Sequence, residues 1–260
     1  MLTIQQVNEA AERIRGLVHR TPIATSDRLD EIAGATLFFK CENLQKAGAF
    51  KARGATNAVF ALAAEDLSNG VATHSSGNHG AALARAAQLR GIPSNIVVPA
   101  NAKRVKREAI VQYGGRVILS ESTLAAREAK LIEVIKESGA QVIHPYDNDF
   151  VIAGQGTAVQ EMLIDTAGLD ALVVPVGGGG LLAGSALVAK QAGIPIYGVE
   201  PEGADDASRS FHSGVLIKTH TPNTICDGLL TTLGEKNFDI IQSNVQDILL
   251  VNDAETIQAM

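Results

Sequence analysis

Apolar and polar positions along the chain follow two different periods, and their alternation predicts the secondary structure. The first helix is predicted over 4–18, where one face carries Ile4, Val7, Ala11, Ile14 and Val18. Beyond it, short β-branched runs are each followed by a segment with helical spacing. Strands are predicted at 36–42, 71–75, 94–99, 116–120, 141–145, 171–176 and 195–200. Helices are predicted at 79–91, 102–115, 123–139, 156–168 and 181–193, and the polar segment 201–222 is predicted to be a loop.

Alternating strands and helices of this length are typical of an α/β fold with a mostly parallel sheet. The chain of 260 residues is 46% hydrophobic and 19% charged, which is enough apolar material for one large or two smaller domains. Its net charge of −6 argues against a nucleic-acid partner or an anionic membrane surface. No apolar run approaches the length of a membrane span.

The two cysteines, Cys41 and Cys226, are far apart and form no CxxC motif. A disulfide framework or thiolate zinc site is therefore not expected, and the composition favours a reducing, cytoplasmic location. The basic segment 102–108 is best explained as a solvated helix face. His144, His212 and His220 show no ligand spacing, and the sequence assigns them no role.

Four consecutive glycines, Gly177–Gly180, lie between a predicted strand and a predicted helix. In open α/β sheets, ligands bind beyond the carboxyl ends of strands, and a glycine-rich turn lets an anion approach backbone N–H groups. A tight turn with positive φ is the simpler explanation, but one glycine satisfies such a turn. The run therefore favours a phosphate-binding loop. The GxxxxGK[ST] motif is absent from the sequence, so a P-loop is not predicted.

Two further stretches carry candidate chemistry. Lys51 follows Phe50 and small residues, surroundings in which a desolvated lysine has a lowered pKa and reacts with aldehydes. Taken alone, this stretch is better explained by a solvated surface lysine. The segment 74–80 (HSSGNHG) crowds hydrogen-bonding groups at a predicted helix start, which suits a carboxylate or phenolate oxygen. An ordinary N-cap turn explains that segment equally well.

Together the three stretches resemble the fold-type II pyridoxal-phosphate enzymes, and within them the serine racemase and serine/threonine dehydratase group. The motifs AFKARGA, SSGNHG and PVGGGGLLAG occur in the family's order, and VIAGQGT, EPEGADD and TICDG add to the resemblance. It implies two domains, each an open twisted mostly parallel sheet flanked by helices, as in the tryptophan synthase β-subunit. The large domain would comprise 1–69 and 146–260, and the small inserted domain 70–145.

The resemblance also implies roles for individual residues. Lys51 matches the lysine joined to the cofactor aldehyde, Phe50 a residue packed against the cofactor ring, and Asn78 a partner of its phenolic oxygen. The phosphate loop matches Gly177, Gly178, Gly179, Gly180 and Leu181. The substrate carboxylate would be bound by Ser75, Asn78 and His79, with Arg127 assisting on domain closure.

Ser76 matches a serine that faces the cofactor opposite the lysine. Lys51 would then act as base on one face of the substrate, and Ser76 would exchange a proton on the other face. Loss of a β-hydroxyl gives a 2-oxo acid and ammonia, whereas reprotonation by Ser76 gives the opposite enantiomer. The resemblance therefore implies a pyridoxal-phosphate-dependent serine/threonine dehydratase (ammonia-lyase), and Ser76 makes serine racemase activity feasible.

The segment EPEGADD matches a divalent-cation loop of the racemase-like branch. Glu200, the Ala204 carbonyl and Asp206 would bind Mg²⁺ or Ca²⁺, since oxygen ligands suit hard cations. Without the resemblance, an acidic solvated loop is the better explanation. Because this loop favours the racemase branch, a β-replacing synthase is a weaker alternative.

Two other readings stay open: a 3-hydroxyaspartate dehydratase, and a catalytically impaired fragment or binding protein with the same fold. Family members continue beyond VNDAETIQAM with a stretch whose serine bonds the pyridine nitrogen, so a C-terminal truncation is expected. Ala47 stands where the family often has threonine. The expected partners are a small amino-acid substrate and, by resemblance, a second copy in a homodimer.

Overall fold

The α/β architecture expected from the sequence is confirmed in the computed structural model, which describes residues 2–75 and 77–260. By its contacts the chain divides into two compact units. One comprises Met1–Ala10, Tyr146–Thr157 and Leu169–Met260, and the other Ala11–Pro145 and Ala158–Gly168. The predicted large and small domains, with 70–145 as the insertion, stay a prediction. None of the described helices is both long and apolar enough to cross a membrane.

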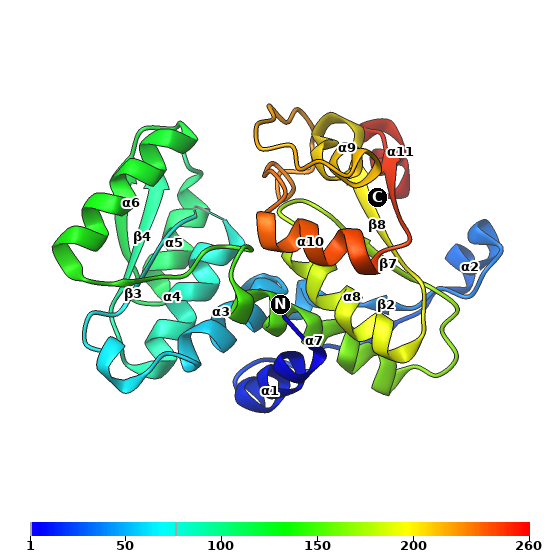
Figure 1. Cartoon of the computed structure of the whole chain (residues 1–260), viewed down its shortest axis with the longest axis horizontal. Coiled ribbons are helices and arrows are strands. Elements are labelled where there is room, and N and C mark those ends of the chain that lie inside the picture. The colour runs from blue at the N-terminus through cyan, green and yellow to red at the C-terminus, as the bar shows by residue number, and fades with distance from the viewer. Residues whose placement is uncertain (1, 76) are drawn as a thin grey trace. The chain divides into compact units, whose positions relative to one another are not determined.

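The unit that contains Ala11–Pro145 is built on a parallel sheet, whose described strands have the order β5-β4-β3-β6. The strands are β3 (Val71–His74), β4 (Ser94–Pro99), β5 (Arg116–Ser120) and β6 (Gln141–Val142). Its helices are α4 (Asn78–Arg90), α5 (Arg104–Gln112) and α6 (Leu124–Ser138). Figure 1 shows α6 on one side of β3 and β4, with α4 and α5 on the other. Helices therefore cover both faces, as parallel strands require.

Local signals explain where these helices begin and end. The Thr123 hydroxyl accepts a hydrogen bond from the Ala126 amide at the start of α6. Gly139 ends α6 and Gly91 ends α4 in the left-handed conformation, with φ of 68° and 71°. The core between α6 and the sheet is formed by Ala72, Val97, Leu131, Val134 and Ala140, with Ile118 and Ile135 packed against it.

The first 70 residues depart most from the sequence prediction. The first helix, α1 (Ile4–Ile14), ends four residues before Val18. The strand expected at 36–42 is reduced to β2 (Phe39–Lys40), which pairs antiparallel with β1 (Ile23–Ala24). The other elements here are α2 (Asp27–Ala33), α3 (Lys51–Phe60) and the short 3₁₀ turns η1 (Glu42–Leu44), η2 (Lys46–Gly48) and η3 (Ala64–Asp66).

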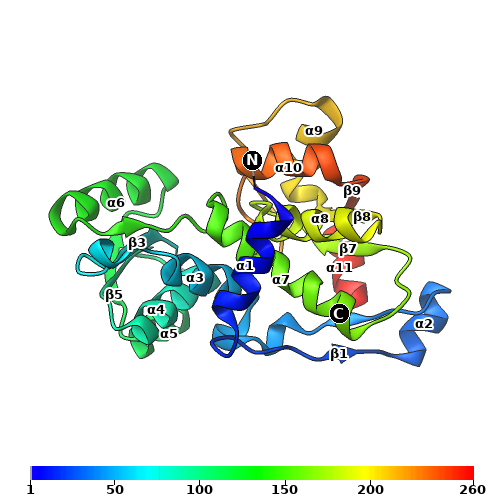
Figure 2. The same ribbon diagram turned by 60° about the horizontal axis from the view of Figure 1, so that its bottom comes forward.

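The unit that contains Leu169–Met260 is built on a second parallel sheet, whose described strands have the order β7-β8-β9. The strands are β7 (Leu172–Pro175), β8 (Ile196–Pro201) and β9 (Asp247–Val251). The helices here are α8 (Gly180–Ala192), α9 (Asp206–Ser213), α10 (Glu235–Asn244) and α11 (Asp253–Ala259), with η4 (Glu202–Ala204) before α9. Helices α8 and α10 lie side by side in both views (Figures 1 and 2).

Two further helices differ from the sequence prediction. Helix α7 (Asp149–Asp165) begins seven residues before the expected start at 156, because the Asn148 side chain accepts from the Val151 amide. Helix α9 lies inside the segment predicted to be a loop. Its first turn is capped by the Glu200 carboxylate, which accepts from the amides of Ala207 and Ser208. A cap from β8 is a tertiary contact that local periodicity does not reveal.

Candidate active site

Lys51 is the first residue of α3, and the structure places its amine away from bulk water. Its Nζ donates a hydrogen bond of 2.9 Å to the carbonyl of Pro145 and lies 5.1 Å from the centroid of the Phe50 ring. The residue is partly buried. Burial lowers the pKa of Lys51 to about 8. These surroundings exclude a solvated surface lysine and make the neutral, nucleophilic amine accessible near physiological pH.

His79 lies in the first turn of α4 and is only 2% exposed. Its Nε2 is 3.1 Å from the carbonyl of Ile143, an acceptor, so Nε2 carries the hydrogen. Burial lowers the pKa of His79 to about 3, and the charge of Lys51 acts in the same direction. The ring is therefore neutral, and its Nδ1 has no partner among the described residues. A carboxylate near His79 would be bound by the main-chain N–H groups of the helix start, not by the imidazole.

Two further histidines, His74 and His144, contact each other, and the charge of Lys51 acts on His144. Their rings meet edge to face, with centroids 5.9 Å apart. Burial lowers the pKa of His144 to about 4, with further lowering by His74 and Lys51. Burial also lowers the pKa of His74, with a contribution from the charge of Arg127. The sequence assigned no role to His144, and the structure pairs its ring with that of His74 and places it within the electrostatic influence of Lys51.

The remaining residues expected at the substrate carboxylate lie on α4 and α6. Asn78 begins α4 and is exposed, Ser75 is half-buried, and Ser76 lies outside the described residues. Arg127 is half-buried on α6, where its Nε donates to the Thr123 carbonyl at 3.4 Å. The roles expected for these residues stay predictions.

The four glycines connect β7 to α8 and are all buried. Gly179 has a φ of +88°, and a Cβ there would lie 2.5 Å from Leu233. A Cβ on Gly178 would lie 2.3–2.5 Å from ring atoms of Tyr146. The Asn237 amide donates to the carbonyls of Gly178 and Tyr146, at 2.7 and 3.1 Å. Packing within the protein therefore requires two of the glycines, and the phosphate role of the loop stays a prediction.

The residues expected to bind a cation surround the start of α9. Both Glu200 and Asp206 are buried, and so is Ala204 of η4. The pKa of Glu200 is raised to about 8, mainly by burial; the hydrogen bonds from the α9 amides lower it and the charge of Asp206 raises it. Asp206 Oδ2 accepts from the Leu233 amide at 2.8 Å, while the buried Oδ1 has no partner in the described structure.

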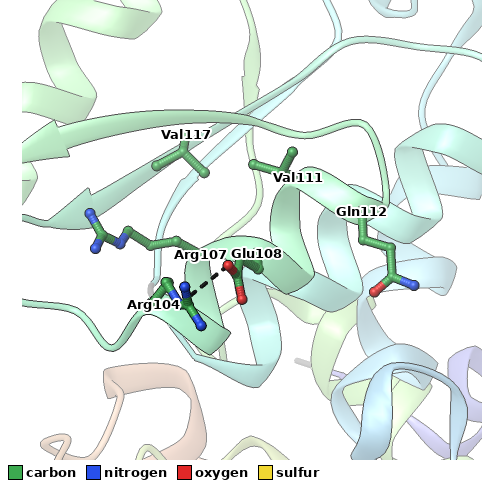
Figure 3. Close-up of a pocket in the computed structure, with 6 residues that line it drawn as sticks. All are labelled: Arg104, Arg107, Glu108, Val111, Gln112 and Val117. Atoms are coloured by element: carbon green, nitrogen blue, oxygen red, sulfur yellow. Dashed lines mark ion pairs between the residues drawn. The ribbon is translucent and has the colours of Figure 1, made fainter.

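A surface hollow of about 500 Å³ lies between α5 and β5, and none of the predicted site residues lines it (Figure 3). It is lined by Arg104, Arg107, Glu108, Val111, Gln112 and Val117. Arg104 pairs with Glu108 one helical turn away at 3.4 Å, and both side chains are largely exposed. This arrangement agrees with the solvated helix face expected at 102–108.

The sequence matches the model of the family described as pyridoxal-phosphate dependent enzymes over residues 14–260. The chain belongs to this family. It is 48% identical to a serine racemase of Arabidopsis thaliana, over 99% of this chain and 78% of the relative. It is 45% identical to a beta-hydroxyaspartate dehydratase of Paracoccus denitrificans, over 99% and 82%. The crystal structure of a serine racemase from Dictyostelium discoideum superposes with a TM-score of 0.95 at 48% identity, covering 100% of this chain and 84% of that one.

In a pyridoxal-phosphate dependent enzyme a lysine amine joins the cofactor aldehyde, and Lys51 has the burial and the lowered pKa that this bond needs. The sequence did not single out three residues: His74, whose ring meets that of His144, and Tyr146 and Asn237 at the glycine loop. Tyr146 and Asn237 contact the glycine loop from positions 31 or more residues away in the chain, so no local motif reveals them. His74 directly precedes Ser75 in the segment HSSGNHG, so its position next to an expected site residue is the signal that could reveal it.

Proposed function

We propose that the protein is a pyridoxal-phosphate-dependent ammonia-lyase that converts a β-hydroxy amino acid to a 2-oxo acid and ammonia. The observation that carries this proposal is the Lys51 amine, held on the Pro145 carbonyl with its pKa lowered to about 8. A family built on pyridoxal phosphate needs one such amine. The names of the relatives, serine racemase and hydroxyaspartate dehydratase, support serine or 3-hydroxyaspartate as substrate. A threonine deaminase among the structural neighbours, 39% identical, supports threonine.

Bound pyridoxal phosphate would supply an aldehyde that holds the amino acid and a ring that spreads negative charge. The protein's own residues would do the rest. Lys51 takes the α-proton, because its lowered pKa lets the free amine accept a proton near neutral pH. The start of α4 binds the substrate carboxylate through main-chain N–H groups. The neutral rings of His74, His79 and His144 add no positive charge that would compete for that carboxylate.

Racemisation of serine is a second candidate activity of the same site. It requires proton exchange on both faces of the substrate, and the sequence offers Ser76 opposite Lys51. Serine racemases from two organisms among the relatives, at 48% identity, favour this addition. Elimination needs Lys51 alone, so Ser76→Ala should abolish D-serine formation while pyruvate formation persists.

The decisive experiment supplies the full chain with pyridoxal phosphate and incubates it separately with L-serine, L-threonine and L-threo-3-hydroxyaspartate. The 2-oxo acid and D-serine are measured together. We expect 2-oxo acid from at least one substrate and a loss of at least about a hundredfold in Lys51→Ala. Lys103→Ala removes an exposed lysine and serves as the matched control. Equal activity of Lys51→Ala and the control would refute the proposal.

We further propose that Glu200, Ala204 and Asp206 hold Mg²⁺ or Ca²⁺ in the unit that contains Leu169–Met260. The residues fit a hard cation, because Asp206 Oδ1 is buried without a partner in the described structure and every donor is an oxygen. Among the described residues no group of three or more His, Cys, Asp or Glu side chains is arranged to hold a metal ion. The proposed site therefore has two carboxylates and a carbonyl, with water completing the shell.

Cation binding predicts a measurable stabilisation. Millimolar CaCl₂ should raise the unfolding temperature of the wild-type chain, since binding to the folded state alone stabilises it. Asp206→Asn should remove most of this rise, whereas Asp205→Asn, one residue away and only partly buried, should keep it. An equal rise in the two variants would contradict the site.

A homodimer and a cytoplasmic location complete the proposal. The resemblance supports the homodimer, and the two unpaired cysteines support the cytoplasmic location.

A further inference from the structure

Arg53 lies two residues after Lys51 in the first turn of α3, and its side chain is completely buried. Its Nε and Nη2 donate to the two carboxylate oxygens of Glu42, each at 2.8 Å. Its Nη1 and Nη2 donate to the two oxygens of Glu161, also at 2.8 Å. Each of two edges of the guanidinium thus binds one carboxylate through two hydrogen bonds. Only arginine has the planar fork that makes both pairs.

The Arg53–Glu42 pair joins the two ends of the segment 42–53, the loop that carries Lys51. This loop contains Ala47, the only non-glycine residue with positive φ in the described chain, at 56°. Gly48 follows it with a φ of 73°. A non-glycine residue in the left-handed region costs energy and persists only where the surroundings enforce it. The loop therefore depends on a constraint at its ends, and the bidentate pair supplies one.

The same loop is also tied to the segment 19–21. Gln45 accepts from the His19 amide and donates to the His19 carbonyl, at 2.8 and 2.7 Å. The Thr21 hydroxyl donates to Glu42 at 2.6 Å, on the carboxylate oxygen that Arg53 also binds. Gln45 and Glu42 are thus hydrogen-bonded to the segment 19–21, and Arg53 is connected to it through Glu42. By contrast, Glu161 belongs to α7 and lies outside the loop.

We propose that Arg53, acting through Glu42, is a positioning residue that keeps the Lys51 amine partly buried against the Pro145 carbonyl. This inference rests on the proposed function, in which Lys51 carries the cofactor. Arg53 itself touches no reacting atom. When the pair is broken, the ends of the loop separate and water reaches the amine of Lys51. If the ion pair had a purely structural role, breaking it would lower stability and leave the burial of that amine unchanged.

The test reads the Lys51 amine without any cofactor. The full chain, freed of pyridoxal phosphate, is methylated with formaldehyde and cyanoborohydride over a range of pH, and each lysine is quantified by mass spectrometry. In the wild type we expect a midpoint near pH 8 for Lys51. In Arg53→Lys and Glu42→Gln the Lys51 midpoint should rise by about one pH unit or more.

Glu161→Gln is the control, because it removes an equal charge from the same guanidinium, together with the ion pair of Glu161 with Lys40 at 2.8 Å, but leaves the ends of the loop joined. It should lower stability and keep the Lys51 midpoint. Arg53→Lys keeps the positive charge without the fork, so a failure to restore the midpoint assigns the effect to geometry. An unchanged midpoint in folded Glu42→Gln, or an equal rise in Glu161→Gln, overturns the proposal.

Thr21→Val covers the case in which the charged variants do not fold. It leaves every charge in place and removes only the hydroxyl that steadies Glu42. A smaller rise of the Lys51 midpoint supports the proposal, and no rise in this variant overturns it. Failure of the proposed function is a separate result. It would appear as absence of a covalent adduct at Lys51 when wild-type protein is treated with pyridoxal phosphate and borohydride.

Discussion

Single residues in this protein owe their chemistry to burial more than to charged partners. Desolvation is the first cause of the lowered pKa values of Lys51, His74, His79 and His144. A group held neutral by burial destabilises the fold at any pH at which the unfolded chain prefers it charged. The residues around the amine should therefore make the protein sensitive to acid.

His79 gives a measurable pH dependence. Its pKa falls from 6.5 to about 3 on folding, so below pH 6.5 the unfolded state binds a proton that the folded state does not. Stability that is present above pH 6.5 is thus lost as the pH falls, at up to about 1.4 kcal/mol per unit. Urea denaturation followed by circular dichroism between pH 7 and 4 measures this slope. His79→Gln should have a shallower slope, and an identical slope would contradict the assignment.

At the scale of elements, the glycine loop and α4 illustrate what a sequence shows and what it hides. The strand–glycine–helix pattern located the glycine loop, and the helix predicted at 79–91 begins within one residue of α4. Periodicity missed α9, because its cap comes from Glu200 on β8. It also missed the contacts of Arg53 with Glu161, 108 residues away. Local signals reveal elements and motifs, while partners distant in the chain appear only once the fold is known.

The fit of Tyr146 over Gly178 predicts a coupled pair of substitutions. Gly178→Ala should lower the free energy of unfolding by about 1–3 kcal/mol, because the added methyl would meet the ring at 2.3 Å. In Gly178→Ala/Tyr146→Ala the methyl has room, so the combined loss should be smaller than the sum of the single losses. A coupling of about 1 kcal/mol or more is expected from urea denaturation. Additive losses would show that the Tyr146 ring does not restrict the size of the side chain at position 178.

On the scale of the whole molecule, the second sheet has one apolar face open to solvent. The ladder pairs Val173 with Tyr197 and Pro175 with Val199, and Val199 is paired in turn with Leu249, so these side chains share a face. Val173 is 66% exposed and Leu249 47%. The opposite face, with Leu172, Val174, Ile196 and Ile248, is buried. An exposed apolar sheet surface of this kind promotes self-association.

Polar substitutions on this face should change association more than stability. Val173→Thr/Leu249→Thr is expected to alter the free energy of unfolding by no more than about 0.5 kcal/mol, since neither side chain is packed in the core. Self-association at high protein concentration, measured by light scattering, should fall. Val174→Thr is the buried counterpart and should be clearly destabilising. A large stability loss in the exposed double variant would show that this face is packed in solution.

The contact between Tyr146 and Gly178 also restricts the order in which this loop can diverge. A side chain at 178 meets the aromatic ring, so a lineage that first replaces the glycine passes through a defective intermediate. A lineage that first shortens residue 146 opens space and can then accept alanine at 178. The two positions should therefore covary among descendants of this sequence, and library designs that randomise one should randomise the other in the same round.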